Sequence, residues 1–140
     1  MGTQQILLIV LSVIIVGIAV AVGITMFNAQ ATNSNRQAIM GDMNNLASSA
    51  LAFYKTPTTH GGGGNAWTGG VDAVGQWLGY DYVSGTGCRT GNGIFALAIS
   101  VDVLTITGVG TEVGNNGSAN VSGTLAITGA TSGLVATIVN

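Results

Sequence analysis

The residues best able to do chemistry stand alone in this chain. His60 is the only histidine and Cys88 the only cysteine, so no disulfide can form within the chain and no ligand pair at metal-binding spacing can be built. Four glycines follow His60, and they offer nothing to hold an imidazole in a catalytic geometry. We therefore expect no catalytic residue, no metal site, no cofactor and no small-molecule substrate, and the sequence does not indicate an enzyme.

Charged residues are few and scattered. Three basic residues stand against five acidic ones, for a net charge of -2, and the acids occur singly. Without a basic patch the chain has no electrostatic footprint for nucleic acid. The glycine-rich stretches do not follow a strand and open a helix, as a phosphate-binding loop would. Two sequons, which begin at Asn116 and Asn120, are candidate glycosylation sites in a predicted loop.

The first element along the chain is an apolar run. No residue from Ile6 to Phe27 is charged, and at ~1.5 Å per residue this segment is long enough to span ~30 Å of hydrocarbon as a helix. An inserted helix normally carries lysine or arginine on its cytoplasmic side, yet none precedes this run. We therefore expect a basic leader ahead of Met1, removed by a peptidase that leaves the apolar run on the product.

Helical periodicity continues beyond the apolar run. Apolar side chains recur at steps of four and three residues, which places them on one face of a helix: Ile39, Met43, Leu46, Ala50 and Phe53. The first stop signal is Lys55 followed by Pro57. We predict one helix over about residues 2–54, with an apolar part in the segment 1–28 and an amphipathic part in the segment 29–55.

The remaining segment, 56–140, predicts a loop followed by an antiparallel sheet. Glycine clusters indicate flexible or tightly turning chain over 56–92, although 71–83 fits a short helix or an extended piece equally well. Four later segments are rich in β-branched residues and are separated by turn residues: Ile94–Ser100, Val103–Thr107, Val121–Thr128 and Leu134–Val139. The sheet and the amphipathic helix each have one apolar face, so we expect them to pack together in a small α+β fold.

In this order of elements the chain resembles the type IV pilin and pseudopilin superfamily. The resemblance is coarse over the whole chain and extends to individual residues from Met1 to Pro57. It implies the pilin fold, and a structural subunit of a bacterial-style, extracellular type IV pilus-like filament at the cell surface, for adhesion or motility. It also implies an inner-membrane anchor before polymerisation, processing by prepilin peptidase, N-methylation of Met1, and contact with the pilus assembly machinery.

The resemblance places the homopolymer contacts on the first half of the helix. Gln5 stands where the family usually has glutamate, and a neutral amide can hydrogen-bond to an ammonium group but cannot neutralise it. Small residues four apart, Gly17 with Ala21 and Ala19 with Gly23, would let helices approach closely. The two glycines are also the expected points of local unwinding in a filament. The expected filament-core contacts are Gln5, Ile6, Leu7, Leu8, Ile9, Leu11, Ile14, Ile15, Gly17, Ile18, Ala21, Gly23, Ile24 and Phe27.

Two other interpretations stay open. A pseudopilin of a secretion system would share the architecture but would form only a short periplasmic polymer. A monomeric single-pass membrane protein with a β ectodomain would account for the apolar run. It would not account for the missing basic flank or for a helical pattern that continues past the membrane span.

Overall fold

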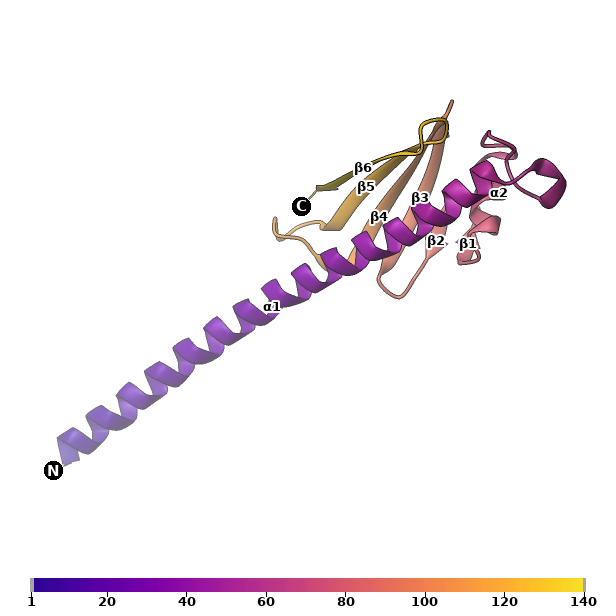
Figure 1. Ribbon diagram of the computed structural model, residues 1–140. Coiled ribbons are helices and arrows are strands. Elements are labelled where there is room, and N and C mark those ends of the chain that lie inside the picture. Colours follow the sequence, from indigo (N-terminus) through magenta and orange to yellow (C-terminus); the bar gives the residue numbers. More distant parts are fainter. Residues whose placement is uncertain (1, 140) are drawn as a thin grey trace.

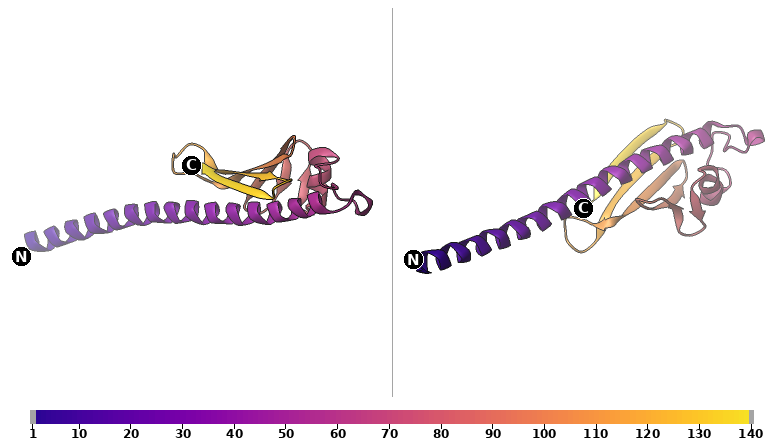
Figure 2. Two further views of the ribbon diagram at one scale, coloured as in Figure 1. Left: turned by 45° about the horizontal axis from the view of Figure 1, so that its top comes forward. Right: turned by 90° about the horizontal axis from the view of Figure 1, so that it is seen from below.

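The computed structural model describes residues 2–139 and has two layers, a long helix and an antiparallel sheet (Figure 1). Helix α1 spans Gly2–Lys55, and its 54 residues extend over about 80 Å at ~1.5 Å per residue. The sheet packs on the C-terminal half of α1, and the N-terminal half projects alone (Figure 2). The α+β fold and the long helix predicted from the sequence are confirmed.

Helix α1 ends where a proline and a glycine-rich loop follow it. Pro57 adopts an extended conformation, with φ -58° and ψ 149°, and cannot continue the helix. Backbone N–H groups of the loop then donate to carbonyl groups of the last turn, Gly63 to Phe53 at 2.8 Å and Asn65 to Tyr54 at 2.7 Å. A Cβ on Gly63 would lie 2.0 Å from a backbone oxygen. The glycine run is therefore a close-fitting cap on the helix end.

The segment expected to be irregular contains four short elements. Residues 71–83 hold both of the structures considered, a helix and then a strand. Irregular chain was also expected over 84–92, and this is wrong at one strand, which pairs on both sides: Cys88 lies opposite Tyr82 and Phe95. A strand of three residues is too short to show a periodicity, so its pairing cannot be anticipated. The elements are η1 (Thr58–His60), α2 (Gly70–Trp77), β1 (Asp81–Val83) and β2 (Gly87–Arg89).

All six strands form one antiparallel meander in chain order. The four longer strands correspond to the four segments predicted: β3 (Gly93–Ser100), β4 (Val103–Val113), β5 (Asn120–Thr128) and β6 (Gly133–Val139). Strand β4 extends beyond Thr107 into a segment expected to turn, and its register with β5 shifts between Val109 and Val113, as at a β-bulge. The β3–β4 turn is tight, and its Val101 has φ 53° and a side chain that is 97% exposed.

The core lies between α1 and one face of the sheet. Strand glycines allow the two layers to approach closely, because a Cβ on Gly108 would lie 3.0 Å from Cγ2 of Ile39, and one on Gly110 would lie 2.0 Å from Oδ1 of Asn35. The helix contributes Ile39, Met43, Leu46, Ala47, Ala50, Phe53 and Tyr54 to the core, and strands β3 to β5 contribute Phe95, Leu104, Ile106, Val121, Leu125 and Ile127.

Strand β6 forms one edge of the sheet, and its side chains are exposed. Every described residue after Gly133 in this strand is exposed, including Leu134 at 51% and Val135 at 67%. Pairing with β5 sets Leu134 opposite Ile127, on the side of α1, and Val135 opposite Ala126, on the outer side. The strand has no charged residue and no proline, so its edge lacks the usual protection against contact with another chain.

Candidate assembly surface

The stem, residues 2–27 of α1, has no buried residue within the described chain. Its large apolar side chains are exposed all round, from 50% at Leu11 to 74% at Phe27. By length and composition the stem can cross a membrane. Leaving a side chain such as Leu or Ile in water, rather than burying it, costs ~1.5–3 kcal/mol. The stem therefore needs lipid or other apolar helices around it.

The residues expected to contact other subunits, from Gln5 to Phe27, all lie on this exposed stem. Met1, the expected processed and methylated terminus, lies outside the described residues. Helix α1 is continuous through Gly17 and Gly23, so the isolated subunit shows no unwinding at either glycine between residues 2 and 55. The structure thus gathers the predicted contacts on one rod with a free surface.

One side of the stem has an apolar hollow of about 530 Å³. Ala19 and Gly23, four residues apart, leave the space, and a Cβ on Gly23 would meet nothing within 4 Å. The other small pair, Gly17 and Ala21, does not line the hollow. Larger side chains surround it: Ile15, Ile18, Val22 and Met26. This geometry suits the close approach of a second helix at Ala19 and Gly23.

The residues expected to pack the helix on the sheet are all at most 2% exposed: Ile39, Met43, Leu46, Ala50 and Phe53. The sequence pattern missed Asn35, which is buried on the same face one turn earlier. Its side-chain amide donates to the carbonyl oxygen of Asn92 at 3.0 Å, and its Oδ1 accepts the N–H of Glu112 at 3.5 Å. The four-residue step from Ile39 back to Asn35 fits the period of an α-helix, but a search for apolar residues passes over an asparagine.

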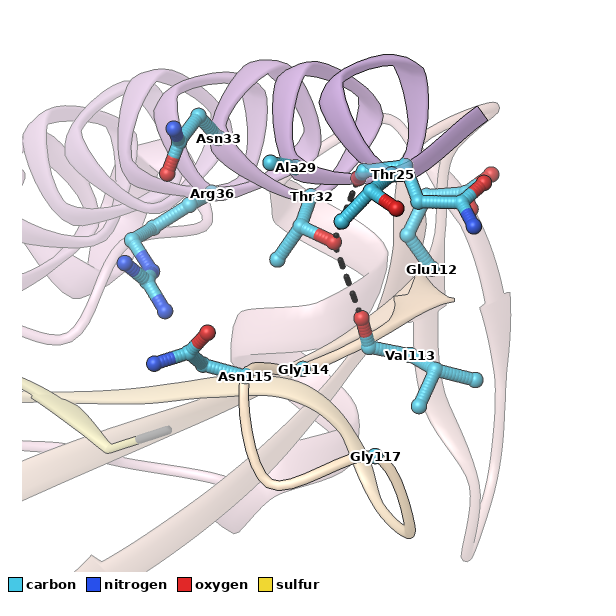
Figure 3. Close-up of a pocket in the computed structure, with 11 residues that line it drawn as sticks. Thr25, Ala29, Thr32, Asn33, Arg36, Glu112, Val113, Gly114, Asn115 and Gly117 are labelled. Carbon is cyan, nitrogen blue, oxygen red and sulfur yellow. Dashed lines mark hydrogen bonds between the residues drawn. The ribbon is translucent and has the colours of Figure 1, made fainter. Parts of the chain in front are cut away.

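A second feature, here named the neck cleft, lies where the stem meets the head, the rest of the described chain (28–139), in which the C-terminal half of α1 packs on the sheet. It has a volume of about 600 Å³ and separates α1 from the loop that joins β4 to β5 (Figure 3). Arg36 extends from α1 towards Asn115 across the cleft (Figure 3). Its Nε is shielded from solvent and has no hydrogen-bond partner in the described chain. On one side, the hydroxyl of Thr32 donates to the carbonyl oxygen of Val113 at 3.0 Å.

Carboxylates in the head accept hydrogen bonds from neutral donors and act as structural links. Asp72 in α2 accepts hydrogen bonds from the hydroxyls of Tyr82 and Ser84, and these bonds lower its pKa. The hydrogen bond from Tyr82 to Asp72, together with burial, raises the pKa of Tyr82 to about 12. Asp42 on α1 accepts two hydrogen bonds from side chains of the β2–β3 turn, at 2.8 Å and 2.9 Å. These carboxylates hold elements together.

The two isolated residues of the sequence remain apart in the fold. His60 is exposed in η1, and Cys88 is a buried residue of β2, where burial raises the pKa of its thiol. A thiol with a raised pKa is a poor nucleophile at neutral pH. Between residues 2 and 139, no three His, Cys, Asp or Glu residues are grouped closely enough to hold a metal ion.

Both sequons lie at the β4–β5 loop. The Oδ1 of Asn116 accepts the backbone N–H groups of Ser118 and Ala119, at 3.1 Å and 3.0 Å. The side-chain amide of Asn120 donates to the carbonyl oxygen of Gly110 at 2.8 Å. Asn116 thus stabilises the loop itself, whereas Asn120 links the start of β5 to β4.

Comparisons of the chain with protein families, with curated proteins and with solved structures find no match. The structure has a long apolar N-terminal helix whose second half packs on an antiparallel sheet. By length and composition this helix could anchor in a membrane. This architecture is compatible with a pilin-like fold.

Proposed function

We propose that the chain is a structural subunit of an extracellular, type IV pilus-like helical filament, polymerised through its stem. One observation carries the proposal: the two halves of α1 have opposite surroundings. The second half seals the core of the head with residues such as Ile39 and Met43, whereas no residue of the stem is buried. A single apolar rod with a folded head at one end suits a polymer with stems inside and heads outside.

The stem has two environments in this proposal. Before assembly it lies in the inner membrane, where acyl chains are about as apolar as its own side chains. Exchange of lipid for other stems gains little hydrophobic free energy, so close packing at Ala19 and Gly23 supplies the selectivity. Outside the membrane the alternative is water, and burial of every stem by its neighbours then holds the polymer together. In the cell, prepilin peptidase processes the chain and assembly machinery extracts the stem from the membrane; once outside the membrane, the stems associate without a further partner.

The edge strand β6 adds support from the head. A helical polymer is built from heterologous contacts, in which two different surfaces of the subunit meet. Strand β6 exposes Leu134 and Val135 at an uncharged edge. A neighbouring head that covers this strand would remove the exposed apolar surface.

A charge in the stem tests the proposal. The full-length chain is purified in detergent, the detergent is removed, and negative-stain electron microscopy records the product. Wild-type protein should form filaments, and Val16→Glu should not, because it buries a carboxylate among apolar helices. Val101→Glu, at a side chain that is 97% exposed in the head, is the matched control and should assemble.

Thermal unfolding of the head in detergent shows whether each variant has folded. Two results contradict the proposal: filaments of Val16→Glu with normal yield, or wild-type protein that stays as folded single subunits once detergent is gone. The second result would favour a monomeric single-pass membrane protein.

A further inference from the structure

Arg36 is a cation without an anion. Among residues 2–139 no carboxylate forms an ion pair with its guanidinium, and the Nε is buried with no hydrogen-bond partner. Glu112 also lines the neck cleft but lies on the far side of Thr32 from Arg36 (Figure 3). A buried donor left unpaired costs free energy, so a site of this kind is suited to an external acceptor.

The rest of the neck cleft is polar and roomy. Hydroxyl and amide side chains line it beside the guanidinium, and its volume of about 600 Å³ exceeds what one or two water molecules need. Arginine binds phosphate oxygens in a bidentate manner, and hydroxyl and amide groups add neutral hydrogen bonds. The polar lining consists of Thr25, Asn28, Thr32, Asn33, Arg36, Glu112 and Asn115, and the Glu112 carboxylate lies on the far side of Thr32 from Arg36.

The position of the cleft along α1 identifies the source of the phosphate. When the apolar run ending at Phe27 spans the hydrocarbon, Thr25 and Asn28 lie at its boundary, in the layer of lipid headgroups. Arg36 is nine positions after Phe27, about 13 Å along the axis, and this headgroup layer is ~5–8 Å thick. Helical side chains tilt towards the N-terminus, and a long arginine side chain can extend its charge towards a membrane surface, although Arg36 here points across the cleft towards Asn115.

We propose that the neck cleft of the membrane-inserted subunit binds the phosphate of a phospholipid headgroup through Arg36. The proposal rests on the membrane-inserted state that the proposed function includes, and it does not depend on polymerisation. The other two cations of the chain, Lys55 and Arg89, lie in the distant half of α1 and in β2. Arg36 is therefore the one cation of the described chain within reach of this headgroup layer.

Lipid binding by single subunits tests the proposal. The full-length chain is kept in dodecyl maltoside micelles doped with phosphatidylethanolamine, and native mass spectrometry counts the lipids that each subunit retains. Wild-type protein should retain one lipid, and Arg36→Gln should lower the affinity about tenfold or more, the typical effect of losing hydrogen bonds to a charged group. Arg89→Gln is the matched control and should behave as wild type. Arg36→Lys should retain part of the binding, because the charge stays but the bidentate geometry is lost.

Two controls isolate the phosphate of the lipid. Diacylglycerol, which has acyl chains but no phosphate, should bind equally weakly to wild type and Arg36→Gln. Thermal unfolding of the head shows whether each variant has folded. If Arg36→Gln does not fold, the test uses Arg36→Lys, which keeps a long aliphatic side chain.

Three results would overturn the proposal. Equal retention of phosphatidylethanolamine by wild type and Arg36→Gln would mean that the stem alone holds lipid. Inorganic phosphate that displaces the lipid at millimolar concentration would mark a site for free oxyanions. Normal lipid retention together with loss of filaments in Arg36→Gln would identify the ligand as a carboxylate of a second copy. Filaments of Arg36→Gln that form normally leave the proposed function intact whatever the lipid result.

Discussion

The hydroxyl of Tyr54, in the last turn of α1, donates a 2.8 Å hydrogen bond to the carboxylate of Asp102 in the β3–β4 turn. The other carboxylate oxygen accepts the N–H of Ala130 at 2.9 Å, and the backbone carbonyl of Asp102 accepts the indole N–H of Trp67 at 3.0 Å. The hydrogen bond to Asp102 raises the pKa of Tyr54. Asp102 thus joins the end of the helix, the loop that follows it and two turns of the sheet.

Tyr54→Phe should loosen this end of the head. The ring still fills its place, but the Asp102 carboxylate loses a donor, so the melting temperature should fall by about 4–8 °C. Tryptophan fluorescence of the full-length chain in detergent, recorded during heating, measures the change. Tyr80→Phe is the control, because Tyr80 is 37% exposed and its hydroxyl makes no hydrogen bond within the described chain. Equal melting temperatures for wild type and Tyr54→Phe would count against this account of the link.

Gly110→Ala should separate the helix from the sheet. The new Cβ would lie 2.0 Å from Asn35 and 2.5 Å from Ile39, so the layers must shift, at a cost of about 1–3 kcal/mol. Gly41→Ala is the matched substitution in exposed α1, where a Cβ meets nothing, and should stabilise by about 0.5–1 kcal/mol. Chemical denaturation measures the free energy of unfolding, which should fall for Gly110→Ala and rise for Gly41→Ala. Stabilisation by Gly110→Ala would show that the layers are not in close contact there.

Much of the fold follows from local patterns, and the exceptions have physical reasons. The helix is predictable because Ile39, Met43 and Phe53 repeat with its period over many turns, and the long strands because β-branched residues cluster between turns. Strands as short as β2 depend on pairing with neighbours, which no local pattern reveals. The neck cleft could not be foreseen, because Arg36 and Asn115 are brought together only by packing of the sheet on the helix.

The contact between Tyr82 and Asp72 should make stability depend on pH at both extremes. Tyr82 binds its proton more tightly in the folded chain, with a pKa of about 12 against an ordinary 10.0, so its contribution is complete below pH 10 and is lost as pH rises to about 12. The pKa of Asp72 is lowered from 3.8, so its contribution is present above that pH and is lost on further acidification.

Tyr82→Phe provides the corresponding measurement. Wild type should be more stable than the variant by a constant margin between pH 5 and 9, and the margin should shrink by about pH 12 and again in acid. Urea denaturation at several pH values records the margin. A margin that is unchanged at pH 12 would show that the hydroxyl of Tyr82 does not hold its proton through Asp72.

Gly23→Leu should reduce filament yield by filling the hollow on the stem. The added side chain occupies the space beside Ala19, so a neighbouring helix can no longer approach closely there. Gly91→Leu is the control, because Gly91 is exposed in the head and a Cβ meets nothing within 4 Å. Sedimentation of polymers after detergent removal gives the yield of each. Equal yields for Gly23→Leu and wild type would show that the hollow takes no part in assembly.

Cryo-electron microscopy of the wild-type chain after detergent has been removed tests most directly whether the stems form the core of a filament. We expect a helical polymer in which stems, from Ile6 to Phe27, pack around the axis and heads lie outside. Folded subunits that stay single, each stem surrounded only by lipid or detergent, would contradict it.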